Sequence, residues 1–238
     1  MKDVAALAGV SLATVSRVVN GSEDVRPDLA AKVQDAVGVL GYRRDLTAST
    51  LRRRDRISAS IGLIIEDVAN PFFSAVHRGV EDVARARGVL LFAGSSDEDP
   101  ERERELADAF TARGVDGLVI VPCGTDQGYL TREREMGTEL VFVARPPRLI
   151  DADPVVPANA AGARTAVGRL RGAGHRRIGF LGDRPTVFTA AERRQGYRDA
   201  LATAGAQADE GLERVGLVDA VVAEAAAHEL LALEEPPT

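Results

Sequence analysis

From residue 61 onward the sequence alternates between two kinds of segment. Short runs rich in Val, Ile and Leu recur at 61–65, 89–94, 117–121, 140–144 and 178–182. Amphipathic stretches that suit helices, each closed by glycine, separate these runs. Strand-sized runs joined by helix-sized connections predict parallel strands with right-handed crossovers. The expected fold class is therefore α/β, with a doubly wound parallel sheet.

Ligands of a doubly wound sheet bind beyond the carboxyl ends of its strands. Glu66 and Asp67 follow the first run and could form a carboxylate pair in an α/β enzyme. Architecture alone does not assign chemistry, however. The sequence contains no dinucleotide-binding glycine motif, no Walker motif and no nucleophile elbow. We therefore expect a binding protein and not an enzyme.

The first 42 residues have a different, all-helical pattern. Helices are predicted at 2–8, 12–19 and 27–40. Gly9 can adopt the left-handed conformation that ends the first helix in a sharp turn. Ser11 can cap the second helix through its hydroxyl group. Two short helices joined by so tight a turn predict a helix-turn-helix.

In a helix-turn-helix, the second helix lies in the major groove and its N-terminal residues face base edges. The residues that would point at the DNA are Leu12, Ala13, Ser16 and Arg17. Arg17 can donate two hydrogen bonds to a guanine, whereas Leu12 and Ala13 offer apolar contact with a thymine methyl group. The alternative is a plain three-helix bundle that uses the same small residues for packing.

Charge is unevenly distributed along the chain. The net charge is −6, yet residues 1–56 carry +3 and the remainder carries −9. Six arginines fall within 43–56, where only two acids oppose them. A basic segment of this kind suits contact with phosphates, and the alternative is a solvated linker. Ser, Thr and Arg dominate residues 45–60, which favours a hinge.

Composition excludes several classes of protein. A hydrophobic content of 45% supports globular domains and excludes disorder as the main state. No apolar run reaches the length of a membrane span, and the N-terminus lacks the apolar stretch of a signal peptide, so a cytoplasmic protein is expected. The single cysteine, Cys123, and three widely separated histidines offer neither a disulfide nor a zinc-site spacing. No cofactor or metal is expected.

A series of motifs runs along nearly the whole chain: KDVAALAGVSLATVSRVVNG, ASTLRR, NPFF, SSDEDPERER, RGVDGLVIVP, GHRRIGFLG and ERRQGYRDAL. Their order resembles the lactose/galactose-repressor family of bacterial transcription regulators. The resemblance implies a helix-turn-helix headpiece at 1–44, a hinge helix at 45–60, and a core similar to periplasmic sugar-binding proteins with lobes at 61–154 and 155–238. It also implies a repressor that works as a homodimer on an inverted-repeat operator in double-stranded DNA, under control of a small-molecule effector such as a sugar or related metabolite.

The resemblance assigns further DNA contacts. Leu51 matches the leucine that family members wedge into the minor groove at the operator centre. Such a wedge unstacks a base step and kinks the duplex; the alternative is a linker residue that rests on the core. The arginines expected near phosphates are Arg52, Arg53 and Arg54. Thr14 and Ser16 would contact phosphates or position the recognition helix.

The resemblance also implies an effector site in the cleft between the lobes, lined by Asn70, Phe72, Phe73, Arg145 and Arg193. Ser95 and Asp97 follow the second predicted strand, a position suited to recognition of hydroxyl groups. Aromatic rings in such a site stack on a sugar or base, and an amide fixes its orientation. Alternatives remain for each group: Phe73 could belong to the core, Ser95 and Asp97 could cap a helix, and the arginines could form surface ion pairs.

The sequence departs from the family pattern in several places. Ala144 stands where many sugar-binding relatives have an acid, and Ala158 replaces a common aspartate. Alanine cannot accept hydrogen bonds from hydroxyl groups, so a polyhydroxylated sugar is a less secure effector. In relatives, a pair like Pro237 and Thr238 leads into the next core strand, so the second lobe is expected to be incomplete. A truncated, non-inducible DNA-binding fragment is therefore the alternative function.

Overall fold

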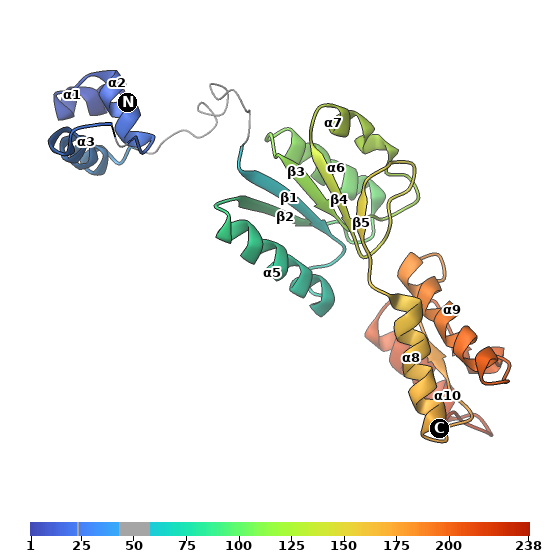
Figure 1. Cartoon of the computed structure of the whole chain (residues 1–238). Coiled ribbons are helices and arrows are strands. Elements are labelled where there is room, and N and C mark those ends of the chain that lie inside the picture. Colours follow the sequence, from blue (N-terminus) through green and yellow to red (C-terminus); the bar gives the residue numbers. More distant parts are fainter. Residues whose placement is uncertain (23, 43–57) are drawn as a thin grey trace. The chain divides into compact units, whose positions relative to one another are not determined.

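The computed structural model describes residues 1–22, 24–42 and 58–238 (Figure 1). The chain divides into two units, Met1–Ser58 and Ala59–Thr238. The described part of the first is all-helical, whereas the second combines helices with parallel strands. No helix in the described ranges is long and apolar enough to cross a membrane.

The first unit packs three helices around one small core. They are α1 (Lys2–Ala8), α2 (Leu12–Val19) and α3 (Pro27–Leu40). Val4, Val15 and Val33 are buried at its centre, because each helix contributes one apolar stripe to the core. Helix α1 ends at Gly9, whose φ of 64° lies in the left-handed region that glycine tolerates. The three predicted helices are confirmed.

The second unit is built on a five-stranded parallel sheet in the order β2-β1-β3-β4-β5. The strands are β1 (Ser60–Ile65), β2 (Leu90–Ser95), β3 (Gly117–Ile120), β4 (Glu139–Val143) and β5 (Asp153–Val155). The first four coincide with predicted runs. Strand β5 was not predicted, because its three residues are exposed and carry no apolar pattern; it exists by pairing with β4.

Side chains on β1 alternate between the two faces of the sheet, and both faces are covered by helices. Leu63 and Ile65 pack with Phe73, whereas Ile64 packs with Phe110 on the opposite face. The helices that follow the first three strands are α5 (Pro71–Ala86), α6 (Pro100–Thr111) and α7 (Thr131–Glu135), the last preceded by the short 3-10 turn η1 (Gly128–Leu130). Helices α5 and α6 lie on opposite sides of the sheet (Figure 1). The predicted doubly wound α/β architecture is confirmed.

The rest of the unit holds three further helices and a small second sheet. Its elements are α8 (Asn159–Gly172), β6 (Phe180–Leu181), α9 (Phe188–Thr203), η2 (Glu210–Leu212), β7 (Glu213–Arg214) and α10 (Ala220–Leu231). Strands β6 and β7 pair in parallel. The predicted strand at 178–182 is therefore shorter than expected, because β7 offers it only two residues for pairing. Tyr197 of α9 anchors the preceding segment, since its hydroxyl donates to the Ile178 carbonyl at 2.8 Å.

Candidate functional site

The turn between α1 and α2 fixes the geometry of the candidate DNA-reading helix. The Val10 N–H donates to the Ala5 carbonyl at 3.1 Å, which closes the turn after Gly9. The Ser11 hydroxyl then accepts the Thr14 N–H at 3.0 Å and caps α2, as the sequence predicts. Val15 is fully buried, so the opposite face of α2 is left free. Tight turn and cap together give the helix-turn-helix geometry.

The free face of α2 carries the residues predicted to face DNA. Leu12, with 47% of its surface exposed, lies near the helix start together with exposed Ala13, and Arg17 is exposed one turn further on. Thr14 and Ser16 are half-buried. The Thr14 hydroxyl lies 2.9 Å from that of Ser11, and the Ser16 hydroxyl accepts from Asn20 Nδ2 at 3.3 Å. The remaining predicted DNA contacts, Leu51, Arg52, Arg53 and Arg54, lie outside the described residues.

A second constellation lies at the carboxyl edge of the five-stranded sheet. Glu66 directly follows β1, Glu98 lies in the loop after β2, and Arg145 comes soon after β4. Arg145 Nη2 bonds to Glu66 Oε2, and Nη1 lies 2.5 Å from Glu98 Oε1 and donates to the Pro122 carbonyl at 3.2 Å. We call Glu66, Glu98 and Arg145 the strand-end cluster. It occupies the edge where parallel α/β sheets bind ligands.

The strand-end cluster is largely shielded from water. The Arg145 side chain is 10% exposed, and those of Glu66 and Glu98 are 22% and 20% exposed. Burial, together with the neighbouring carboxyl group of Glu98, raises the pKa of Glu66 from 4.5 to about 7, against the opposing charge of Arg145. One carboxyl group of the pair can therefore carry a proton near neutral pH. Arg145 Nε is buried and has no hydrogen-bond partner among the described residues.

Strained backbone holds the strand-end cluster in place. Asp97, Glu98 and Ala144 have φ values of 53°, 61° and 67°, in the left-handed region that side chains other than glycine rarely adopt. The Ala144 N–H is satisfied by the Val155 carbonyl at 2.9 Å, which fixes the backbone just before Arg145. Strain of this kind costs about 1–3 kcal/mol per residue and gathers at functional sites.

Other predicted effector residues surround this edge with different roles. The Asn70 side chain caps α5 by accepting the Phe72 N–H at 3.0 Å, and Phe72 remains 47% exposed. Ser95 Oγ accepts the Val68 N–H at 3.3 Å. Asp97 forms an exposed ion pair with Arg102. These four residues lie around the ends of β1 and β2, near the cluster in the fold.

Two predicted residues are placed differently. Phe73 is 5% exposed and packs against Leu63 and Ile65 in the core, which favours the alternative that it is a core residue. Its neighbour Phe72 takes the outer position because consecutive residues of α5 face different directions. Arg193 lies on α9, where its Nε donates to Asn159 Oδ1 at 2.9 Å, and it borders a hollow of about 530 Å³ between α8, α9 and β6.

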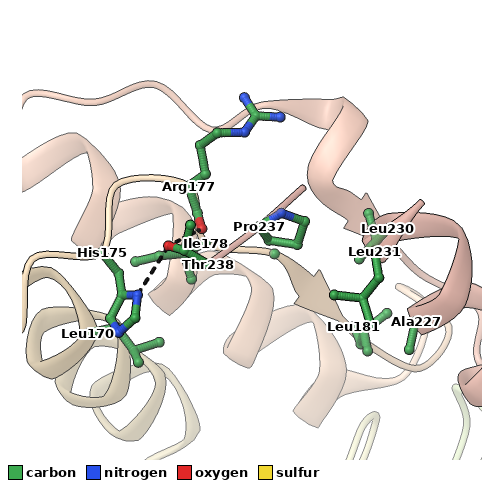
Figure 2. A pocket seen from close by; sticks show the side chains of 11 residues that line it. Leu170, His175, Arg177, Ile178, Leu181, Ala227, Leu230, Leu231, Pro237 and Thr238 are labelled. Atoms are coloured by element: carbon green, nitrogen blue, oxygen red, sulfur yellow. Dashed lines mark hydrogen bonds between the residues drawn. The ribbon is translucent and has the colours of Figure 1, made fainter. Parts of the chain in front are cut away.

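A second hollow of about 350 Å³, which shares Leu170, Ile178 and Gly179 with the first, lies beside β6 and α10 (Figure 2). Apolar side chains including Leu181 and Leu230 line it, and His175 Nδ1 meets Thr238 Oγ1 at 3.1 Å at one end. It offers few polar groups to orient a small molecule. The strand-end cluster therefore remains the better candidate for ligand recognition.

Sequence reasoning missed Glu98 and treated Glu66 only as part of a carboxylate pair with Asp67. In the structure Asp67 instead caps its own loop, accepting the Ala69 N–H at 2.7 Å. The available signal was position, because both glutamates closely follow predicted strands. Their meeting with Arg145 depends on the adjacency of strands, which one sequence does not reveal.

Comparison with known proteins identifies the family. Residues 58–238 match the family model of periplasmic binding proteins and the sugar-binding domain of the LacI family. Residues 1–45 match the model of bacterial regulatory proteins of the lacI family. The order of the two matches follows the order of the two units described above.

Similar proteins are bacterial transcriptional regulators. The HTH-type transcriptional regulator GalS of Salmonella typhimurium is 32% identical over 97% of this chain and 67% of its own length. The maltose regulon regulatory protein MalI of Escherichia coli is 34% identical over 82% of this chain and 57% of its own length. The chain thus spans about three fifths to two thirds of the length of these relatives.

A solved structure shares the fold over nearly the whole chain. A transcriptional regulator CelR–cellobiose complex matches with a TM-score of 0.63 and 30% identity, over 97% of this chain and 69% of the other. The helix-turn-helix unit, the doubly wound core and these matches agree. This chain belongs to the LacI family of bacterial regulatory proteins.

Proposed function

We propose that this chain is a transcriptional regulator, acting as a repressor, that binds an inverted-repeat operator in double-stranded DNA as a homodimer. The observation that carries the proposal is α2, which is capped and buried on one side and free on the other. Membership of the LacI family supports the same reading. A protein that reads operator DNA in a bacterium works in the cytoplasm. The proposed division is a headpiece at 1–44, a hinge at 45–60 and lobes at 61–154 and 155–238.

Base reading is assigned to the free face of α2. Arg17 would donate two hydrogen bonds to guanine, and Leu12 and Ala13 would contact thymine methyl groups. Thr14 and Ser16 would bind phosphates or position the recognition helix, since both residues are only partly exposed. Phosphate contacts fix the orientation of the helix, and base contacts supply the sequence preference.

The hinge would couple two headpieces at the operator centre. Leu51 is proposed as the apolar wedge in the minor groove, and the charges of Arg52, Arg53 and Arg54 would neutralise nearby phosphates. Kinking the duplex lets both recognition helices reach their half-sites. These assignments rest on the sequence motif that carries Leu51.

Control by a small-molecule effector is assigned to the carboxyl edge of the large sheet. The proposed contacts are the strand-end cluster with Asn70, Phe72, Ser95, Asp97 and, from the second lobe, Arg193. The relative described as a CelR–cellobiose complex supports an effector of the sugar or related-metabolite class. Effector binding would shift the population between two arrangements of the lobes and so change the spacing of the headpieces.

Selection of bound sites from random duplex DNA tests this function. The full chain is incubated with the pool at moderate ionic strength, and recovered sequences are read. The proposal predicts enrichment of an inverted repeat whose half-sites contain a guanine in the major groove that Arg17 can reach. Sites recovered in a matched selection with Arg17→Ala should no longer show a preference for that guanine, but should keep the spacing between half-sites. Recovery of unrelated sequences with no common site would refute the proposal.

A further inference from the structure

Arg145 is occupied by groups of its own chain. Its guanidinium contacts carboxylates of Glu66 and Glu98 and the Pro122 carbonyl, so both terminal nitrogens are engaged. The side chain is nine-tenths buried, and its remaining nitrogen, Nε, is without a hydrogen-bond partner in the described ranges. A positive group held in this way cannot give its full charge to a ligand.

The charged groups around Glu66 leave an excess of negative charge. The charges of Glu98, Asp183 and Arg145 act on Glu66. Arg184, which lies after β6, approaches Glu98 Oε2 and Asp183 Oδ1 at 3.6 Å each. Three carboxyl groups are thus opposed by two guanidinium groups. A proton on one of the Glu66 and Glu98 carboxyl groups removes the excess, in agreement with the raised pKa of Glu66.

This charge balance discriminates among ligand classes. An anionic ligand would find both guanidinium groups already paired with carboxylates, so the cluster offers it no unpaired positive charge. A neutral polyol could exchange hydrogen bonds but would leave the proton in place. A cationic group would supply the missing positive charge directly. An ammonium group also offers three donors, enough to engage both Glu66 and Glu98.

We propose that the strand-end cluster takes an effector with a cationic amino group on a polyhydroxylated frame, and that its ammonium replaces the proton shared by Glu66 and Glu98. This inference rests on the proposed function, whose effector site it specifies. On binding, the Glu66 carboxyl group loses its proton to solvent, and the resulting carboxylate accepts an N–H from the ammonium. The ligand keeps its own protons, so binding releases one proton from the protein.

Proton release makes the affinity depend on pH. With a Glu66 pKa of about 7, the carboxyl group is mostly protonated at pH 6 and mostly ionised at pH 8. Competition between ammonium and proton therefore raises the apparent affinity about tenfold between these two pH values. A simple aliphatic amine stays charged throughout this range, as a lysine side chain does.

Calorimetric titration of the full chain with matched probes tests the inference. Glucamine, sorbitol and gluconate share one polyol frame and end in an ammonium, a hydroxyl and a carboxylate. Aminopropanediol, glycerol and glycerate repeat the comparison on a shorter frame. The expected order in at least one frame is ammonium, then hydroxyl, then carboxylate, with about tenfold tighter binding of the amine than of the alcohol at pH 8. Titrations in buffers of different ionisation enthalpy should show proton release at pH 6.

Two variants separate the site from general charge effects. Glu66→Gln should lose both the pH dependence and the preference for the amine. Glu81→Gln, which removes an acid that pairs with Arg78 on the surface of α5, should retain both. Equal affinity for amine and alcohol in both frames, no binding of either amine, or a preference that survives in Glu66→Gln overturns the inference. Operator preference is measured on the same preparation, so failure of DNA reading is distinguished from failure of this ligand assignment.

Discussion

At the scale of single residues, Arg145 is a buried charge that groups of its own chain neutralise. A buried charge needs partners, because removing one partner of a buried pair typically costs about 3–5 kcal/mol. Here two carboxyl groups and one carbonyl surround one guanidinium. The protonation of Glu66 and Glu98 is therefore a property of the pair and not of either residue alone.

The raised pKa of Glu66 predicts a pH dependence of stability. The folded state binds the Glu66 proton more tightly than the unfolded chain, so this contribution is fully present below about pH 4.5 and is lost as pH rises through about 7. Glu66→Gln removes the titration. Between pH 4.5 and pH 8, the free energy of unfolding of the variant should rise by about 2–3 kcal/mol relative to that of wild type. Urea denaturation measures it.

Comparing Glu66→Gln with wild type at each pH cancels the contributions of other titrating groups to the free energy of unfolding. Glu213 is one such group, because hydrogen bonds from Arg198 and Arg194 lower its pKa despite burial, and its contribution is lost as pH falls. A difference between Glu66→Gln and wild type that stays constant from pH 4.5 to pH 8 would contradict the protonated pair.

Arg17 is the residue expected to carry most of the base discrimination. Arg17→Ala should cost about 1–3 kcal/mol of preference for the correct base over its replacement, since a bidentate contact with guanine is lost. Arg26→Ala is the control, because it removes an equal charge from an exposed ion pair with Asp28. Fluorescence anisotropy with matched and substituted duplexes measures both. An equal loss of preference in the two variants would count against a specific contact.

Residue roles set by local sequence were predictable. The Ser11 cap and the left-handed Gly9 depend on neighbours within a few positions, and both are present. The role of Glu98 depends on Arg145, which is distant in sequence, and was not predicted. Phe72 and Phe73 are adjacent and chemically identical, so only packing decides which one is buried.

At the scale of elements, the close crossing of α8 and α9 depends on Gly196. A Cβ at this position would lie 2.2 Å from the Ala160 carbonyl oxygen. The obstacle is backbone, which cannot rotate away as a side chain can. The two helices can therefore approach only where no side chain stands between them.

Gly196→Ala should destabilise the unit Ala59–Thr238 by about 1–3 kcal/mol, because the added methyl group forces the helices apart. Gly79→Ala is the matched control, since Gly79 also lies within a helix but its Cβ would meet no atom within 4 Å. The free energy of unfolding of that control should rise by about 0.5–1 kcal/mol, because alanine has the higher helix propensity. Urea denaturation followed by circular dichroism measures both changes; stabilisation by both substitutions would refute the close crossing.

The helices and strands that could be predicted are those whose own residues carry an apolar pattern or a capping residue. The runs that became β1 to β4 have apolar side chains for both faces of the sheet, and the helices have caps or closing glycines. Strands β5 and β7 have three and two residues and are defined only by the strands beside them. The helical stretch expected between the runs 117–121 and 140–144 divides into η1 and α7 for a similar reason, because buried Leu130 packs its turn against the core.

At the scale of the whole molecule, a basic head precedes an acidic core. Residues 1–56 carry +3 and the remainder −9. The excess of positive charge suits the head to the phosphate backbone, whereas the negative remainder is repelled by DNA and is free to serve another function. Two family models match in the same order as these two regions.

The proposed coupling of two headpieces predicts a distinct effect of the hinge. Leu51→Ala should weaken operator binding by about tenfold or more while leaving nonspecific binding nearly unchanged, because only the kinked operator complex uses the wedge. Anisotropy titrations with operator and unrelated duplexes provide the two affinities. Equal losses on both duplexes would argue against a wedge and in favour of a linker residue.

The central claim is that the helix-turn-helix unit reads duplex sequence. Its most direct test is the affinity of the full chain for the selected inverted repeat, compared with a scrambled duplex of the same composition at physiological salt. The account predicts that the inverted repeat binds at least about 10³-fold more tightly, as specific regulators do. Equal affinities for the two duplexes, in a preparation whose circular dichroism shows it to be folded, would contradict the account.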